Sequence, residues 1–286
     1  ATVADDADTE SRDHDCWESL GHEKPLPEKL AVRIPEHDAR VLRFILAFLD
    51  SQGVGHAPLF INGGYVRDLL LNKLPDDLDL TLGLHQCPAE VTFGGLLERV
   101  PGFAASNPNL GIKDIKVATT LSSESQDKQL DAFKGYFNDI DGRKIEVDVM
   151  PTIGEEKYEE GNRIPVRDVR GTPQQDALRR DLTIGALLLR VTQPSKSDQT
   201  LRYEIFDFFG GVSDLRRGIL RVPCPVDKTV SEIRAVVLLT PEQEKLAERL
   251  GLSGLPDNDA SQALWWAKVL TDDPLRICRA LRFAAK

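Results

Sequence analysis

The spacing of apolar residues in the first third of the chain predicts a helix followed by a strand–helix–strand unit. Between residues 35 and 53, apolar side chains recur three and four positions apart, as they do along one face of a helix. Short apolar runs at residues 59–61 and 78–82 predict two buried strands. A helix is expected between these strands, after the glycine pair at Gly63 and Gly64.

Further along the chain the pattern predicts strands and two long helices. Residues 145–149 alternate between apolar and acidic side chains, which is typical of a strand with one buried face. Residues 174–190 have an apolar second half and predict one helix. A last helix is expected from residues 272–274, with Thr271 as its cap and Pro274 in its first turn. The other expected elements are helices at 89–100 and 242–250 and extended segments at 113–120, 201–208 and 219–222.

The charge of the chain is acidic and unevenly distributed. Its 286 residues include 36 Lys and Arg against 46 Asp and Glu, a formal net charge of −10. An acidic total disfavours nucleic-acid binding, which depends on neutralising phosphates. The first twenty residues, however, hold seven acidic residues and one arginine, which is −6 of that total and leaves −4 for the other 266 residues. The argument against an RNA partner is weaker for that reason.

Cysteine spacing and the lengths of apolar runs bear on the compartment. The cysteines at 16, 87, 224 and 278 form no Cys-x-x-Cys pair, so reduced thiols in the cytoplasm are expected, with a nuclear or mitochondrial pool left open. The polar, acidic residues 1–30 are expected to be a disordered tail. No apolar run approaches the roughly 20 residues that cross a bilayer, so no membrane partner is expected.

Two signals for phosphate and metal chemistry lie close together in the sequence. Gly63 and Gly64 stand between a predicted strand and a predicted helix start, where backbone N–H groups can approach a phosphate. Asp77 and Asp79 are two positions apart on a strand, so their carboxylates point to one face and can share Mg²⁺. Either signal alone is more often an ordinary turn or a solvated strand edge. Together they favour nucleotidyl or phosphoryl transfer, in which two metal ions stabilise the attacking and leaving oxygens.

Residues 63–79 read Gly-Gly-x-Val-Arg-Asp-x-Leu-Leu and then Asp-x-Asp, which resembles the first motif of the class II nucleotidyltransferases. That family comprises the tRNA CCA-adding enzymes and the bacterial poly(A) polymerases. The resemblance implies that Asp77 and Asp79 bind catalytic Mg²⁺. Asp148 fits a third catalytic carboxylate on a neighbouring strand, because it shares a strand face with Glu146; a solvent-facing strand residue is the alternative.

The same resemblance assigns residues to the incoming nucleotide. It implies that Gly63, Gly64 and Arg67 help to seat the triphosphate. Arg180 and Asp181 belong to an Arg-Arg-Asp sequence similar to the family's second motif, which contacts the ribose. An aspartate can accept a hydrogen bond from a 2′-OH while a guanidinium binds phosphate or sugar oxygens, and RNA precursors are selected in this way.

Near the end of the chain a series of charged residues resembles the family motif that selects the base. Asp273, Arg276, Arg279 and Arg282 recur every three residues, which predicts one polar stripe on a helix. Asp273 would accept a hydrogen bond from the amino group of C or A, and Arg276 would donate to the ring nitrogen, whereas U and G present the opposite polarity. For these residues taken alone, an ordinary helical ion pair is the alternative.

Three features depart from the family pattern. Gly185 stands where the family usually has Asn, and Leu188 and Leu189 replace the aromatic residues that normally follow. Residues 227–270 separate the third motif, which residues 207–223 resemble, from the base-selecting motif, where the family typically has a short link. These departures suit either a divergent enzyme or a chain that has lost its activity.

The resemblance implies an α+β fold: a polymerase-β-like nucleotidyltransferase head with a mixed, mainly antiparallel sheet of about five strands, followed by the start of a helical neck. The expected organisation is an acidic disordered tail at 1–30, the head at 31–226, an insertion at 227–270 and the first helix of the neck at 271–286.

The implied function is addition of C and A to tRNA 3′ ends from CTP and ATP, without a nucleic-acid template and by a two-metal mechanism. Mg²⁺ is then the cofactor and the tRNA 3′ end the partner. One alternative is a poly(A) polymerase or a partial CC- or A-adding enzyme. Another is a non-catalytic nucleotide- or RNA-binding remnant of the same fold. The sequence does not indicate an oligomeric state.

Overall fold

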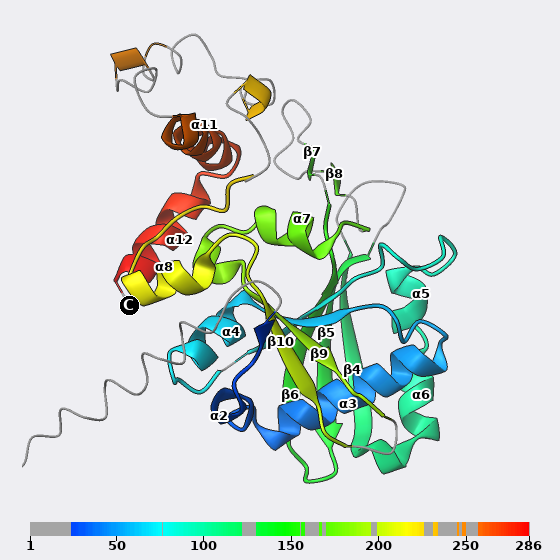
Figure 1. Ribbon diagram of the computed structural model, residues 1–286. Helices are drawn as coiled ribbons and strands as arrows, with labels where there is room; N and C mark the ends of the chain where they lie inside the picture. The colour runs from blue at the N-terminus through cyan, green and yellow to red at the C-terminus, as the bar shows by residue number, and fades with distance from the viewer. Residues whose placement is uncertain are drawn as a thin grey trace, which may run out of the picture.

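An eight-stranded mixed sheet forms the centre of the computed structural model (Figure 1). The structure describes residues 24–75, 77–121, 130–154, 156–157, 166–167, 170–195, 199–225, 231–233, 245, 248–249 and 257–285. The strands follow the order β1-β10-β9-β2-β3-β6-β5-β4, and β7 and β8 pair separately. Their bounds are β1 Lys24–Pro25, β2 Leu59–Asn62, β3 Leu78–Leu82, β4 Ile112–Leu121, β5 Leu130–Asp139, β6 Lys144–Pro151, β7 Glu156–Lys157, β8 Val166–Arg167, β9 Leu188–Thr192 and β10 Arg202–Phe206.

The sheet is mixed and mainly antiparallel, as expected, but it is wider than expected. β3 and β6 run parallel, and the other described neighbours in the sheet are antiparallel. The count of about five strands that the resemblance implies is wrong, because the sheet has eight; the hydrophobic pattern did not predict β1, β5 and β9. The predicted extended segment at 219–222 is also wrong, since these residues lie outside the described strands.

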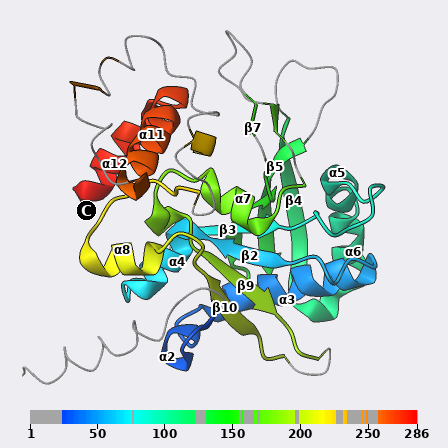
Figure 2. The ribbon, with the colours of Figure 1, turned by 45° about the horizontal axis from the view of Figure 1, so that its top comes forward.

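Helices pack against one face of this sheet. α3, α4, α5 and α6 all contribute side chains to the core on that face, and α7 lies beyond the end of β6 (Figure 2). The helix bounds are α2 Glu28–Ala31, α3 Glu36–Ser51, α4 Gly63–Leu70, α5 Phe93–Leu97, α6 Val100–Ser106, α7 Pro173–Leu178, α8 Gly211–Arg217, α11 Asp257–Asp272 and α12 Leu275–Ala284, with short 3₁₀ helices η1 Pro108–Leu110 and η2 Thr183–Gly185. The helix expected at 89–100 is two helices, α5 and α6, with Pro101 in the first turn of the second.

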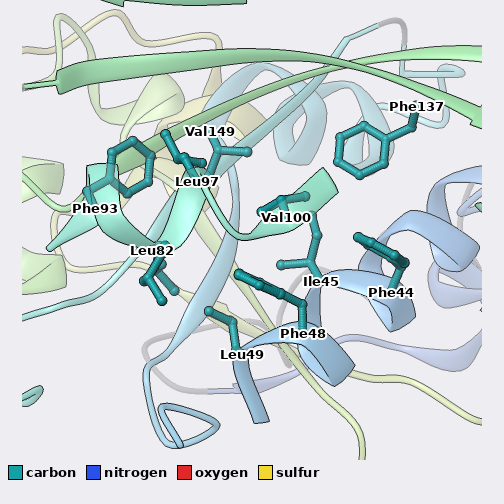
Figure 3. A pocket seen from close by; sticks show the side chains of 11 residues that line it. Phe44, Ile45, Phe48, Leu49, Leu82, Phe93, Leu97, Val100, Phe137 and Val149 are labelled. Atoms are coloured by element: carbon teal, nitrogen blue, oxygen red, sulfur yellow. The ribbon is translucent and has the colours of Figure 1, made fainter. Parts of the chain in front are cut away.

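The main core lies between the sheet and the helices α3, α5 and α6. Phe44 and Phe48 of α3 both contact the ring of Phe103 edge to face, with centroids 5.4 Å apart. An apolar cavity of about 40 Å³ remains between this layer and the sheet, and Val149 of β6 is among the residues that line it (Figure 3). The apolar stripe predicted on α3 is therefore confirmed as its buried face.

The prediction of one helix over residues 174–190 is wrong. α7 ends at Leu178, η2 follows, and Leu188 already begins β9. β9 lies between β10 and β2 in the sheet, and Leu187, Leu188 and Leu189 have no exposed surface. A strand buried on both faces reads as a continuous apolar run, which periodicity cannot distinguish from a buried helix.

The N-terminal boundary expected at residue 30 falls inside the fold. Lys24 and Pro25 pair with β10, and Leu26 and Leu30 join the main core. Residues 1–23 of the expected tail lie outside the described residues.

At the other end of the chain, α11 continues across the expected boundary at residue 270 and ends at Asp272, so Thr271 does not cap a helix that starts there. Pro274 separates α11 from α12. Trp265 of α11 donates its indole N–H to the carbonyl of Pro223 at 2.8 Å, which joins the end of the expected insertion to the third motif. Most of the helix expected at 242–250 lies outside the described residues. Among the helices that are described, none has the length and apolarity needed to cross a membrane.

Candidate active site

Two of the predicted catalytic carboxylates lie side by side on the sheet. Asp79 of β3 and Asp148 of β6 are directly paired across the parallel strands, and Lys134 of β5 is paired with Asp148 on its other side. Asp77 precedes β3 by one residue and is exposed. Asp79, Asp148 and Lys134 therefore form a row across three strands, which we call the carboxylate row.

The electrostatics of the carboxylate row show an excess of negative charge. Burial, followed by the charges of Asp148 and Asp77, raises the pKa of Asp79 to about 6, while Arg180 and Lys134 act in the opposite direction. Burial also raises the pKa of Asp148, and Lys134 partly offsets this effect. Asp148 Oδ1 is buried and has no hydrogen-bond partner among the described residues. A cation placed here would satisfy that oxygen and relieve the repulsion.

The metal ligands that the row offers are the carboxylate oxygens of Asp79 and Asp148, and carboxylate oxygen is the ligand type that Mg²⁺ prefers. Within the described part of the chain, no three His, Cys, Asp or Glu side chains converge to form a ready metal cluster. The paired carboxylates of Asp79 and Asp148 are accordingly the part of the row that suits a divalent ion.

The glycine pair begins helix α4 directly after β2. A Cβ on Gly63 would lie 2.1 Å from the carbonyl oxygen of Gly185, so glycine is required there by packing against η2. A Cβ on Gly64 would meet nothing within 4 Å. The second glycine is thus not required by any described contact, and the space beside it is open at the N-terminal end of a helix.

Two buried polar residues that sequence reasoning missed hold this turn. Asn62, 2% exposed, accepts a hydrogen bond from Thr81 Oγ1 at 2.8 Å, whereas its Nδ2 has no partner among the described residues. Tyr65 donates its hydroxyl to Asp38 at 2.8 Å and so ties α4 to α3. Burial raises the pKa of both Asp38 and Tyr65. Neither contact has a local sequence signal, because each joins residues that are distant along the chain.

Arg67 and Arg282 lie together, apart from the carboxylate row. Arg67 Nη2 is 2.8 Å from Asp68 Oδ1, and its guanidinium lies over the ring of Phe283, 5.0 Å from the centroid. Arg282 lies over the same ring at 5.2 Å. A pocket of about 560 Å³ opens here between α4, α8 and α12. The recorded contacts of both arginines are therefore with α4 and α12 rather than with the paired carboxylates.

The second motif is organised around Asp176, a residue to which the sequence analysis assigned no role. Asp176 is fully buried, accepts from the backbone N–H of Ile153 at 3.1 Å, and forms ion pairs with Arg179 at 2.9 Å and Arg180 at 2.6 Å. Burial alone would raise the pKa of Asp176, but the two arginines and these hydrogen bonds outweigh it and lower the pKa. The spacing of an aspartate three and four residues before the arginines is a signal that could have found it.

Helix α12 brings two arginines against the end of the second motif. Arg279 Nη2 donates to Asp181 Oδ1 at 3.1 Å and to Asp273 Oδ2 at 2.6 Å. The Arg276 Nε lies 3.4 Å from Asp181 Oδ1 and 3.7 Å from Asp273 Oδ2, and Arg276 Nη1 donates to the carbonyl of Arg180 at 3.4 Å. Five predicted nucleotide-binding residues thus meet: Arg180, Asp181, Asp273, Arg276 and Arg279.

Three residues of the predicted polar stripe lie on α12, and the fourth, Asp273, does not. Asp273 precedes α12, and its Oδ1 accepts a hydrogen bond from the backbone N–H of Leu275 at 3.1 Å, so it caps the helix in place of Thr271. Arg282 is exposed and contacts Phe283 instead of the carboxylates.

A hydrogen bond from Thr183 to the buried carboxylate of Asp214 joins the second motif to the third. Asp214 of α8 contacts Arg221 through both oxygens, at 2.8 and 2.9 Å, and accepts from Thr183 Oγ1 at 2.6 Å. Asp207 accepts from the backbone N–H groups of Gly211 and Val212, at 2.7 and 3.0 Å, which holds the first turn of α8. These contacts support the segment on which Asp181 lies.

Comparisons with known proteins agree with this arrangement. The sequence profile described as the poly(A) polymerase head domain matches residues 59–221. The mitochondrial CCA tRNA nucleotidyltransferase of Candida glabrata is 28% identical over 262 residues, which cover 89% of this chain and 38% of that protein. The corresponding protein of Saccharomyces cerevisiae is 29% identical over 229 residues, 80% of this chain and 31% of that protein.

Two further matches extend the comparison. Poly(A) polymerase I of Haemophilus influenzae is 31% identical over 165 residues, 57% of this chain and 29% of that protein. A solved apo form of a CCA-adding enzyme shares the fold with a TM-score of 0.50 at 20% identity, over 92% of this chain and 57% of that chain. The chain spans less than half the length of the three relatives named here. Because the profile match covers more than half of the chain and includes the carboxylate row, the glycine pair and the second motif, the chain belongs to the poly(A) polymerase head-domain family.

Proposed function

We propose that this chain is the catalytic head of a nucleotidyltransferase that adds C and A to tRNA 3′ ends from CTP and ATP without a nucleic-acid template. The observation that carries the proposal is the directly paired Asp79 and Asp148, with an unpartnered carboxylate oxygen, near a glycine pair that opens a helix. The names of the two yeast relatives support the choice of tRNA as the acceptor.

Divalent metal ions are general in this family, and the chemistry of the carboxylate row fits Mg²⁺. Asp79 and Asp148 would hold it, with Asp77 as a further, exposed ligand. When bound, Mg²⁺ supplies charge stabilisation for the attacking 3′-hydroxyl and the pyrophosphate leaving group. The surplus negative charge of the row and the free Asp148 Oδ1 support this assignment.

The roles of the other residues follow from their positions. The open space beside Gly64 lets a phosphate approach the backbone N–H groups of α4, with Gly63 serving the packing of the turn. Arg180, held by Asp176, lies close enough to lower the pKa of Asp79 and would bind phosphate or sugar oxygens. Arg67 would reach the triphosphate only by leaving Asp68 and Phe283.

Selection of the nucleotide would take place at the junction of η2 and α12. Asp181 would accept from the ribose 2′-OH, while Asp273 and Arg276 would read the amino group and ring nitrogen of C or A. Their meeting in one cluster supports a shared nucleotide site. Arg282 is exposed and lies over Phe283, so it would reach the nucleotide only by leaving that ring. The cytoplasmic location stays a prediction; the two yeast relatives are named mitochondrial.

Poly(A) addition is the second candidate function. It is favoured by the 31% identity to the poly(A) polymerase I of Haemophilus influenzae. Both activities would use the same carboxylate row, so the acceptor and the nucleotide choice distinguish them.

One experiment tests the proposal. The chain is incubated with Mg²⁺, a tRNA that ends before its CCA, and each labelled nucleoside triphosphate separately and in pairs. We expect incorporation from CTP first and from ATP once CTP has been used, with product length limited to the CCA end. Unlimited ATP addition would support the poly(A) alternative. Catalysis at this site would be contradicted if the unmodified chain incorporated no nucleotide. It would also be contradicted if Asp77→Ala and Asp79→Ala left incorporation unchanged.

A further inference from the structure

The guanidinium of Arg279 connects two carboxylates that come from distant parts of the chain. Its Nη2 donates to both Asp181 at 3.1 Å and Asp273 at 2.6 Å, and its Nε lies 2.5 Å from the second oxygen of Asp181. Asp181 follows α7, whereas Asp273 caps α12. One side chain therefore fixes the relative position of the two carboxylates.

Under the proposed function these two carboxylates have different tasks. Asp181 accepts from the ribose 2′-OH and Asp273 accepts from the amino group of the base. A carboxylate held by a planar guanidinium has few orientations open to it, because the donors of arginine are fixed in one plane. A change in the contact of Arg279 with one carboxylate consequently alters its contact with the other.

We propose that Arg279 couples the selection of the sugar to the selection of the base, so that a nucleotide is accepted only when both its 2′-OH and its base edge fit. This inference rests on the proposed function. It assigns to Arg279 a task beyond general nucleotide binding: it sets specificity by holding Asp181 and Asp273 in a fixed relation.

Arg276 is less suited to this task, although it lies beside the same carboxylates. It is 9% exposed, its closest contacts with them are 3.4 and 3.7 Å, and its Nη1 is committed to the carbonyl of Arg180. The Arg279 side chain is 36% exposed, so a substrate can reach and reposition it.

The test uses Arg279→Lys, which keeps the positive charge but replaces a planar fork by a single ammonium that cannot reproduce the same bridge. Affinities of the chain for CTP, dCTP and UTP are measured by equilibrium titration without tRNA, and tRNA extension with the same nucleotides is measured in parallel. We expect the preferences for CTP over dCTP and for CTP over UTP to fall together, each by about tenfold. Arg279→Gln should behave in the same way.

The matched control is Arg40→Lys. Arg40 Nη1 also bridges two carboxylates, those of Asp139 at 2.9 Å and Asp141 at 2.7 Å, but it lies on α3, outside the proposed nucleotide site. It should leave both preferences unchanged. Circular dichroism melting of each variant establishes that the fold is intact.

Loss of only one preference in Arg279→Lys, or of neither, would overturn the coupling. If the chain binds CTP selectively but does not extend tRNA, the proposed function is contradicted. The nucleotide affinities of the Arg279 variants then still test the coupling. A chain that shows no preference for CTP over dCTP and UTP before mutation contradicts the coupling as well.

Discussion

A Cβ on Gly63 would approach the carbonyl oxygen of Gly185 to 2.1 Å, so the start of α4 and the 3₁₀ helix of the second motif are in direct backbone contact. Gly64, the next residue, has open space at the corresponding point. Of these two adjacent glycines, the first is required by packing, and we propose that the second is required for access of a phosphate to the backbone.

The first prediction compares alanine at these two positions. Gly63→Ala should destabilise the fold by about 1–3 kcal/mol or more, since backbone must move to admit the methyl group. Gly64→Ala should leave the stability unchanged or raise it by about 0.5–1 kcal/mol, because alanine favours a helix, yet weaken triphosphate binding. Urea denaturation and CTP titration of both variants provide the check. Equal loss of stability in the two variants would contradict the assignment.

The second prediction concerns Asp176 and acid stability. Its folded-state pKa is lowered from an ordinary value of 3.8, so the contribution of its ion pairs to stability is present above about pH 4 and is lost as the pH falls through the lower, folded pKa. Asp176→Asn should lower the free energy of unfolding by about 3–5 kcal/mol at pH 7, because Arg179 and Arg180 lose their buried ion-pair partner.

The difference in free energy of unfolding between the unmodified chain and the Asp176→Asn variant should shrink as the pH is lowered from 5 towards 2. Urea denaturation at each pH measures it. The exposed Asp114, exchanged for Asn, serves as the control and should show no comparable dependence. A cost that stays constant with pH would contradict the ionised state of Asp176.

The third prediction concerns Arg276. Arg276→Ala removes the donor that we propose for reading the base and leaves the carboxylate row untouched, since the recorded partners of Arg276 are Arg180, Asp181 and Asp273. Discrimination of CTP and ATP against UTP and GTP should therefore fall, and Mg²⁺ binding, followed by calorimetric titration, should stay the same. An unaltered base preference would refute the role in base reading.

The fourth prediction tests the apolar cavity below the sheet. Val149 lines the 40 Å³ space, whereas Val147, on the same strand and the same face, is absent from its lining and has no exposed surface. Val149→Ile should stabilise the fold by up to about 1 kcal/mol, because it fills part of the cavity. Val147→Ile should destabilise it by about 1–3 kcal/mol through overpacking. Thermal melting of both variants shows whether each substitution raises or lowers the stability of the fold.

The parts of the site that could be predicted from the sequence are those whose residues lie close together along the chain. The glycine pair, Asp77 and Asp79 fall within one strand–helix–strand unit, and the alternation at 145–149 indicated the face of Asp148. The row formed by Asp79, Asp148 and Lys134 joins three strands, and β5 was not recognised in the sequence, so Lys134 was missed.

Other features were missed because the pattern has two physical interpretations. β9 is apolar on both faces and was mistaken for the second half of a helix. The spacing of three from Asp273 through Arg276 to Arg279 indicates one continuous helix, but Pro274 separates α11 from the new helix α12. The meeting of Arg279 with Asp181 depends on how α12 packs, and no local pattern encodes it.

The parallel pairing of β3 with β6 has a consequence for how the protein folds. Asp79 and Asp148 are about seventy residues apart along the chain, and β4 and β5 lie between β3 and β6 in the sequence. Closing so long a loop reduces the entropy of the chain before any stabilising contact forms. This pairing therefore belongs to the slow, non-local part of folding. Helices such as α3 can form from local contacts, whereas Asp79 and Asp148 are brought together only when β3 has paired with β6. We therefore expect the ability to bind a divalent cation to appear late in refolding, and substitutions that weaken the β4–β5 hairpin to delay it more than they delay helix formation.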